Sequence, residues 1–158
     1  MAILQYLEDT RPLPSLWPSD PLQRARVREI CETVVSGIQP LQNVGLKKYF
    51  SSADQFQTFA QTIAQRGLQT LEELLKNSSG GKYCVGDQLT AADICFVPQI
   101  FNAAGRLEYA LLDGCALYDI TQSYSQAQAL RPWAGPHRPD AASELSVTDV
   151  VTTSGADG

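Results

Sequence analysis

A run of amide side chains beside a proline is the segment of this sequence whose residue types suit the binding of a small polar ligand. Gln39, Gln42 and Asn43 flank Pro40 on its two sides. Proline has no backbone N–H, so a helix that passes through Pro40 leaves the carbonyl of Ser36 without its usual partner. Amide donors and acceptors beside a freed carbonyl suit an amino acid or a peptide ligand. The same residues also fit a solvated helix end, and the residues alone favour that alternative.

The sequence carries none of the common motifs of self-contained catalysis or phosphate binding. It has no Gly-x-Ser-x-Gly elbow, no Walker loop and no Gly-x-Gly-x-x-Gly. The single histidine, His137, lies in a proline-rich stretch where no shell of neighbours would hold it for catalysis. We therefore predict no catalytic residue in this chain.

The four cysteines predict neither a metal site nor a disulfide scaffold. Cys31, Cys84, Cys95 and Cys115 form no Cys-x-x-Cys pair, and zinc sites of the common types need closely spaced ligand pairs. A chain of this length buries its own core, so the cysteines are interpreted as buried thiols in a reducing compartment. We expect burial to raise the pKa of Cys31, Cys84 and Cys95, whereas Cys115, in a glycine-containing loop, is expected to be the most exposed.

The elements that must position these residues are predicted to be helices. Residues 2–8 have apolar side chains at helical spacing, and residues 9–21 contain four prolines and are typical of an extended linker. Asp20, followed by a proline, is a strong helix start. It opens a long amphipathic helix that reaches Leu41 and is interrupted near Pro40.

Two further helix starts carry capping-box spacing. Ser52 and Thr90 each stand three residues before an amide or acidic side chain. The helix after Thr90 is expected at the centre of the fold, with a bend at Pro98, because its residues are almost continuously apolar: Ile94, Cys95, Val97, Ile100, Phe101 and Ala104. A fourth helix is predicted over residues 117–130. No stretch alternates as a strand does, so the predicted fold class is all-α.

Composition excludes several classes of partner. The chain has 158 residues with 12 basic and 17 acidic side chains, and its net charge of −5 argues against a nucleic-acid surface. No apolar run approaches the ~18 residues of a membrane span, and residues 1–11 lack the pattern of a signal peptide. We therefore expect a cytoplasmic protein with no membrane or nucleic-acid partner.

Residues 131–158 are predicted to be coil, with a disordered tail over 146–158.

Several segments resemble one known family. Residues 37–43 (Gly-Ile-Gln-Pro-Leu-Gln-Asn) and 83–99 (Tyr-Cys-Val-Gly-Asp-Gln-Leu-Thr-Ala-Ala-Asp-Ile-Cys-Phe-Val-Pro-Gln) are similar to the C-terminal domain of zeta-class glutathione transferases, the maleylacetoacetate isomerases of tyrosine and phenylalanine breakdown. Residues 2–12 resemble the end of that family's thioredoxin-like domain and its linker, and residues 137–145 resemble its closing motif. The resemblance extends over residues 1–145 and implies a glutathione-transferase C-terminal-like helical bundle.

The resemblance also implies a division of the chain. Residues 1–8 would be the last helix of a truncated thioredoxin-like domain, 9–21 the linker, 22–145 the C-terminal helical domain and 146–158 the disordered tail. The family binds glutathione mainly through the thioredoxin-like domain and activates its thiol there. We therefore expect this chain to be N-terminally truncated, and weak or inactive by itself.

The resemblance assigns site residues one by one. Gln39 matches a glutamine that reaches glutathione from the helical domain, and Asn43, Val44 and Gly45 match a neighbouring contact segment. Arg106 corresponds to an arginine near the acidic end of the substrate. A cation there suits maleylacetoacetate, a dianion that needs charge-assisted contacts. No catalytic residue and no metal ligand is implied within this chain.

Three interpretations remain open from the sequence. The first is a glutathione-dependent cis-trans isomerase by descent, whose family members are homodimers. The second is a non-catalytic helical interaction module that uses Ile3, Leu4, Leu7 and Trp17 as an uncovered apolar surface, in a homodimer or in a heterodimer with a full-length relative. The third is an incomplete gene product.

Overall fold

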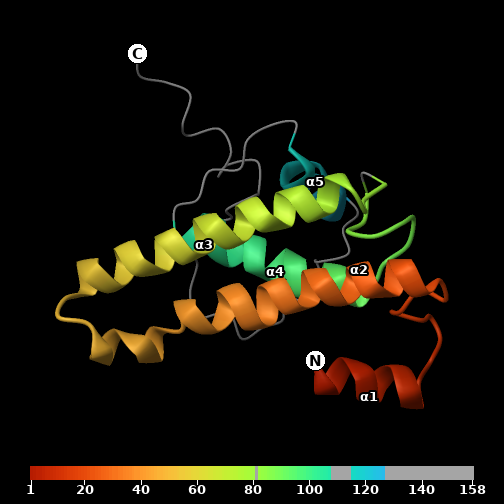
Figure 1. The fold of residues 1–158 in the computed structure, drawn as a ribbon, viewed down its shortest axis with the longest axis horizontal. Coiled ribbons are helices and arrows are strands. Elements are labelled where there is room, and N and C mark those ends of the chain that lie inside the picture. The colour runs from red at the N-terminus through yellow and green to blue at the C-terminus, as the bar shows by residue number, and fades with distance from the viewer. Residues whose placement is uncertain (81, 108–114, 127–158) are drawn as a thin grey trace.

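The computed structural model describes residues 1–80, 82–107 and 115–126, and within them the chain is a set of helices joined by loops (Figure 1). The all-α prediction is therefore confirmed. In chain order the elements are α1 (Ala2–Thr10), α2 (Pro21–Glu32), the π-helical turn η1 (Thr33–Ile38), the 3-10 helices η2 (Gln39–Gln42) and η3 (Val44–Tyr49), α3 (Ala53–Lys76), α4 (Ala91–Arg106) and α5 (Ala116–Gln126).

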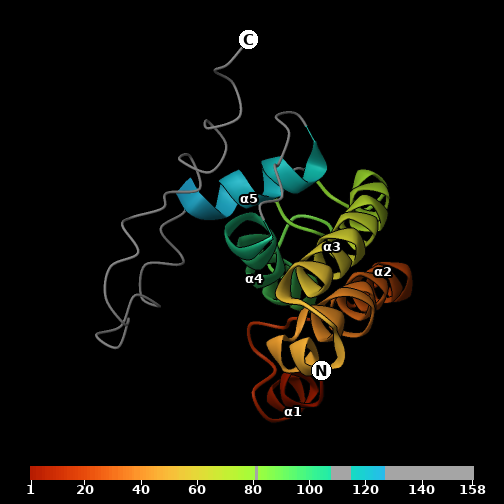
Figure 2. The same ribbon diagram turned by 90° about the vertical axis from the view of Figure 1, so that its left-hand side faces the viewer.

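Three helices build the centre of the fold. Figure 2 shows α2, α3 and α4 packed side by side, with α5 lying across one side of this group and α1 at the opposite end. The buried core joins residues from α2, η1, α3, α4 and α5, with Val27, Ile30, Leu68, Phe96 and Ile120 among those that are fully buried. Burial of these side chains supplies the main driving force for packing.

The long helix expected between Asp20 and Leu41 is not a continuous α-helix. Asp20 caps α2 as predicted, since its carboxylate accepts a hydrogen bond from the Gln23 backbone N–H at 2.8 Å. The α-helix ends at Glu32, and the next six residues widen into η1. Proline cannot donate a backbone hydrogen bond, and its ring would strike the carbonyl four residues earlier in an α-helix. A wider turn before Pro40 relieves that conflict.

The two predicted capping positions are confirmed. The Ser52 hydroxyl accepts from the Gln55 backbone N–H at 3.1 Å at the start of α3. At the start of α4, the buried Asp93 carboxylate accepts from the Thr90 backbone N–H at 2.8 Å and from the Cys84 backbone N–H at 2.7 Å. Asp93 therefore caps α4 and also ties the preceding loop to it.

Burial on α4 differs from the sequence expectation at two positions. Ile94 and Phe101 are 38% and 42% exposed, whereas the buried set includes Ala92, Phe96 and Ile100. A helix in contact with neighbours on one side has an outward face even when that face is apolar. The prediction of a central α4 holds for its inner face only.

The apolar surface predicted near the N-terminus is also smaller than expected. Ile3 is 75% exposed, but Leu4 and Trp17 are partly buried and pack against the core. Leu7 is partly buried as well. The linker is held to α1 by Glu8, whose carboxylate accepts from the Leu16 backbone N–H at 2.9 Å.

The helix predicted over 117–130 is α5, which the structure describes as Ala116–Gln126. The coil predicted from residue 131, including His137, and the disorder predicted for 146–158 lie outside the described residues. Among the helices that the structure describes, none combines the length and the apolar character needed to cross a membrane.

Candidate functional site

The residues assigned to glutathione come together on one exposed segment. Gln39 begins η2, and Asn43, Val44 and Gly45 lie at the junction between η2 and η3. All four are exposed. The Asn43 side chain accepts a hydrogen bond from the Gly45 backbone N–H at 2.8 Å, which fixes the turn between the two short helices. We call residues 39–45 the amide rim.

Gln42 does not belong to the exposed part of this rim. It is only 5% exposed, and its Oε1 accepts a hydrogen bond from Nδ2 of Asn102 on α4. The sequence placed Gln42 among the ligand-binding amides, and the structure shows that its oxygen anchors the rim to α4. No local pattern could have revealed this, because the partner lies 60 residues away.

The Gln42–Asn102 contact brings the rim next to the end of α4. Arg106, the predicted substrate residue, is the last residue of α4 and stands one helical turn after Asn102. The backbone thus places the rim and Arg106 at the same end of the helix group. The side chain of Arg106 lies outside what the structure describes.

A hollow of about 250 Å³ opens beside this contact. It lies between η3, the first turns of α3 and the end of α4. Its wall contains the polar residues Gln42, Lys47 and Asn102 and the apolar residues Phe56, Ala60 and Leu107. Sequence reasoning missed Lys47, Asn102 and the hollow itself, since they become neighbours only through tertiary packing.

Lys47 contributes the positive charge of the hollow. Its Nζ lies 5.9 Å from the ring centroid of Phe56, a distance at which the ring face attracts a cation. Phe56 is buried in the first turn of α3 and packs edge-on against Phe50, with ring centroids 5.4 Å apart. The aromatic pair therefore provides an apolar surface beneath the Lys47 ammonium group.

The burial of the four cysteines differs from the expectation. Cys31 and Cys84 are buried, and Cys95 and Cys115 are both partly buried, so Cys115 is not set apart by exposure. Burial raises the pKa of the Cys84 thiol. A hydrogen bond between the thiols of Cys31 and Cys95 raises the pKa of Cys31 and lowers that of Cys95. Burial raises the pKa of Cys95 as predicted, but the hydrogen bond outweighs it, so the net shift is downward.

The described residues contain no group of three or more His, Cys, Asp or Glu side chains placed to hold a metal ion. The polar groups that gather at the amide rim and the hollow are amides, backbone groups and one ammonium. Such groups bind and orient polar or anionic ligands through hydrogen bonds and charge.

Comparison with known proteins identifies the family of this chain. Residues 43–130 match the family model described as the glutathione S-transferase C-terminal domain. The chain is 53% identical over 103 residues to probable maleylacetoacetate isomerase 1 of Drosophila melanogaster, covering 65% of this chain and 41% of that protein. It is 40% identical over 145 residues to maleylacetoacetate isomerase of Rattus norvegicus, covering 92% of this chain and 66% of that protein. The chain thus spans less than two thirds of the length of these relatives.

Solved structures give the same result. The maleylacetoacetate isomerase of Anaeromyxobacter dehalogenans, with bound dicarboxyethyl glutathione and citrate in its active site, matches with a TM-score of 0.75 at 34% identity over 92% of this chain and 66% of that chain. Maleyl pyruvate isomerase, a bacterial zeta-class glutathione S-transferase, matches with a TM-score of 0.78 at 30% identity over 89% of this chain and 69% of that chain. The chain therefore belongs to the glutathione S-transferase family and carries the C-terminal helical domain of its zeta class.

Proposed function

We propose that this chain is the helical domain of a glutathione-dependent cis-trans isomerase that converts maleylacetoacetate to fumarylacetoacetate. The observation that carries the proposal is the amide rim: Gln39, Asn43, Val44 and Gly45 form one exposed segment at the end of the helix group. Amide and backbone groups on an exposed turn suit glutathione, a small peptide with amide, carboxylate and ammonium groups.

The roles proposed for individual residues follow from their chemistry. Gln39 would donate to or accept from the peptide groups of glutathione, and residues 43–45 would line its edge. Arg106 would pair with a carboxylate of the substrate, because maleylacetoacetate carries two negative charges. Glutathione, when bound, supplies the thiol that adds reversibly to the conjugated double bond. The chain's own task is to hold both molecules in one orientation, which lowers the entropic part of the barrier.

Carboxylate ligands have a precedent among the structural neighbours. Citrate and dicarboxyethyl glutathione occupy the active site of the Anaeromyxobacter isomerase. We extend to this chain the same ligand classes, glutathione and a small molecule with more than one carboxylate.

We further propose the domain division that the resemblance implies: residues 1–8 as the last helix of a thioredoxin-like domain, 9–21 as linker, 22–145 as the helical domain and 146–158 as a tail. The proposed location is the cytoplasm. Cys31 and Cys84 are buried free thiols, and free buried cysteines fit a reducing compartment.

A domain exchange tests the proposed activity. Residues 9–145 of this chain would replace the corresponding helical domain of the rat isomerase, to which the chain is 40% identical. We expect the chimera to isomerise maleylacetoacetate, with Gln39→Ala raising KM for glutathione and Gln65→Ala, on the exposed face of α3, leaving it unchanged. A folded chimera without turnover would contradict the proposal.

The 158-residue chain alone is expected to show weak isomerase activity. Its described rim offers amide and backbone groups, and no cation, to stabilise a thiolate.

A second candidate is a non-catalytic interaction module. The observation that favours it is the exposure of large apolar side chains on the first two helices: Ile3 is 75%, Tyr6 66% and Leu22 68% exposed. Such surfaces commonly mark protein contacts. The proposed partner is a second copy of this chain or a full-length relative. Light scattering that shows a monodisperse monomer, and no complex after mixing with the rat isomerase, would remove the support for this candidate.

A further inference from the structure

We propose that the hollow between η3 and the end of α4 is a carboxylate subsite, in which Lys47 and Gln42 hold one anionic arm of the substrate. This inference rests on the proposed function, since it names the part of the site that receives an acidic end of an isomerase substrate. It assigns a binding role to two residues outside the set that the family resemblance supplied.

The charge of the hollow selects the ligand class. Lys47 is the only charged residue among those that line it within the described part of the chain, and none of the lining residues is a carboxylate. An ammonium group beside amides, with no carboxylate among the lining residues, favours an anion there. A carboxylate pairs with an ammonium and with amide N–H groups at once, and such charge-assisted bonds are about twice as strong as neutral ones.

Gln42 supplies a donor that needs an acceptor. Its Oε1 accepts a hydrogen bond from Nδ2 of Asn102. Nε2 of Gln42 is buried and has no hydrogen-bond partner among the residues that the structure describes. A buried donor without a partner destabilises the folded protein, and a carboxylate oxygen at the hollow would provide that partner.

The size and position of the hollow fit one arm of a ligand. Its volume of about 250 Å³ is below the ~300–1,000 Å³ of pockets that enclose a whole small molecule. Phe56, Ala60 and Leu107 give it an apolar wall. The rest of the ligand would extend toward the amide rim and the end of α4, where the backbone places Arg106. Two cations at one end of the helix group match a substrate with two acidic ends.

The neighbouring lysine offers a matched control. Lys48 lies beside Lys47 in sequence, is also exposed, and also covers an aromatic ring, with its Nζ 5.0 Å from the centroid of Tyr49. It does not line the hollow. Lys47→Met and Lys48→Met therefore remove the same charge from adjacent positions, and only one of the two changes touches the proposed subsite.

The test uses malonate as the probe on the full 158-residue chain. Binding is measured by titration in ¹H–¹⁵N NMR, in which the side-chain NH₂ signals of Gln42 and Asn102 report on the hollow directly. We expect malonate to move these signals, neutral malonamide to leave them unchanged, and Lys47→Met to weaken binding about tenfold. Lys48→Met is expected to bind as the parent does, and Lys47→Arg to retain most of the affinity.

Gln42→Met provides a second variant that keeps the volume of the side chain. It is expected to weaken malonate binding while the cooperative unfolding transition is retained. An equal response of the Lys47→Met and Lys48→Met variants, or no shift of the Gln42 signal at saturating malonate, would overturn the subsite.

A glutathione titration on the same samples separates the two proposals. Glutathione binding without Lys47-dependent malonate binding would refute the subsite and leave the proposed function standing. Lys47-dependent malonate binding without glutathione binding would support the subsite and contradict the role of the amide rim.

Discussion

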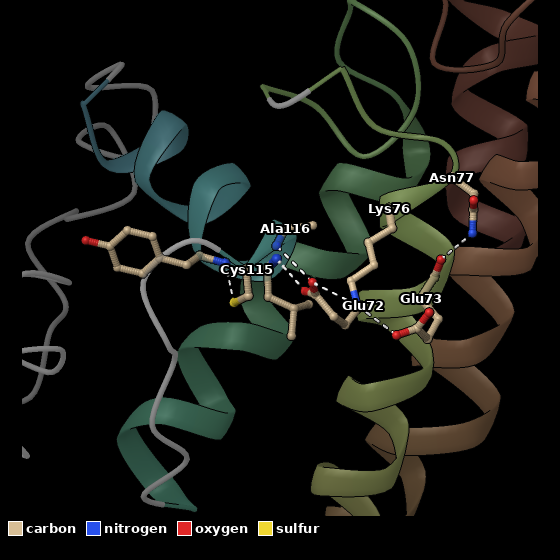
Figure 3. Close-up of polar contacts among 8 residues, drawn as sticks. Glu72, Glu73, Lys76, Asn77, Cys115 and Ala116 are labelled. Atoms are coloured by element: carbon tan, nitrogen blue, oxygen red, sulfur yellow. Dashed lines mark hydrogen bonds and ion pairs between the residues drawn. The ribbon is translucent and has the colours of Figure 1, made fainter.

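The carboxylate of Glu72 on α3 accepts a hydrogen bond from the backbone N–H of Ala116, the first residue of α5, at 3.1 Å (Figure 3). Its second oxygen accepts from the Leu117 backbone N–H at 3.0 Å. Helix N-termini leave backbone donors unsatisfied and carry a partial positive charge. Glu72 thus supplies to α5, from another helix, the cap that a local residue usually provides.

Loss of this long-range cap should destabilise the protein measurably. We expect Glu72→Ala to lower the free energy of unfolding by about 1–2 kcal/mol, since two backbone donors lose a charged acceptor. The control is Glu73→Ala, one residue along, where the exposed side chain pairs with exposed Lys76. This change is expected to lower the free energy of unfolding by less than ~0.5 kcal/mol. Urea unfolding measures both variants, and equal losses would contradict a capping role.

Substitution of Asp93 should destabilise the protein far more than substitution of an exposed carboxylate. It is buried and accepts three hydrogen bonds, from the Thr90 backbone N–H, the Thr90 hydroxyl and the Cys84 backbone N–H. Asp93→Ala leaves these donors buried without an acceptor, so we expect a loss of about 3 kcal/mol or more. Asp87→Ala, at an exposed loop position, is expected to change the unfolding midpoint little. A small effect at Asp93 would show that the loop and α4 are held together by packing instead.

Local signals account for what could be predicted from the sequence. Asp20, Ser52 and Thr90 predicted three helix starts because capping depends on neighbours within three residues. The features that were missed depend on partners far away in the sequence. Gln42 accepts a hydrogen bond from Asn102, and α5 is capped by Glu72. The π-helical turn before Pro40 was expected only as an interruption, because the sequence does not reveal how a helix resolves the conflict with proline.

The exposure of apolar residues on α4 shows the same limit of prediction from local sequence. Ile94 and Phe101 fit the apolar pattern as well as Phe96 and Ile100 do. Only the positions of neighbouring elements, among them α2 and η1, decide which of these residues are covered. Among the assigned site residues, Gln39, Asn43, Val44 and Gly45 are neighbours in the sequence and lie on one exposed segment in the structure. It could not locate Lys47, whose importance depends on the hollow.

The close packing of α3 against η1 should tolerate no side chain at Gly67. A Cβ at this position would collide with Cγ1 and Cδ1 of buried Ile38, which directly precedes Gln39. We expect Gly67→Ala to destabilise the protein by about 1–3 kcal/mol and to weaken glutathione binding by displacing the rim. Gly105→Ala on α4 meets nothing within 4 Å and is expected to stabilise by up to ~1 kcal/mol. Thermal unfolding compares the two, and a gain in stability at Gly67 would contradict the close approach.

Cys95 should be the most reactive of the three thiols in the α2–α4 region. A hydrogen bond with the Cys31 thiol lowers its pKa against the opposing effect of partial burial, whereas Cys31 and Cys84 are buried with raised pKa values. A lowered pKa gives more thiolate at a given pH, so the iodoacetamide rate at Cys95 should rise at a lower pH than for an ordinary thiol. Peptide mapping by mass spectrometry measures this rate.

The Cys31→Ala variant tests the cause of that shift. Without the hydrogen bond, the pKa of Cys95 should rise, and the pH–rate profile of its alkylation should move to higher pH. Cys115→Ala, at the start of α5, is expected to leave the profile unchanged. Modification of Cys84 before Cys95, or an unmoved profile in Cys31→Ala, would show that the contact between the thiols does not control reactivity.

The most direct test of the account is calorimetric titration of the 158-residue chain with glutathione, in the parent and in the Gln39→Ala and Gln65→Ala variants. We predict that the parent binds, that Gln39→Ala weakens binding about three- to tenfold through the loss of one or more hydrogen bonds, and that Gln65→Ala binds as the parent does. Binding that is insensitive to Gln39, or no heat of binding in the parent, would contradict the claim that the amide rim forms part of a glutathione site.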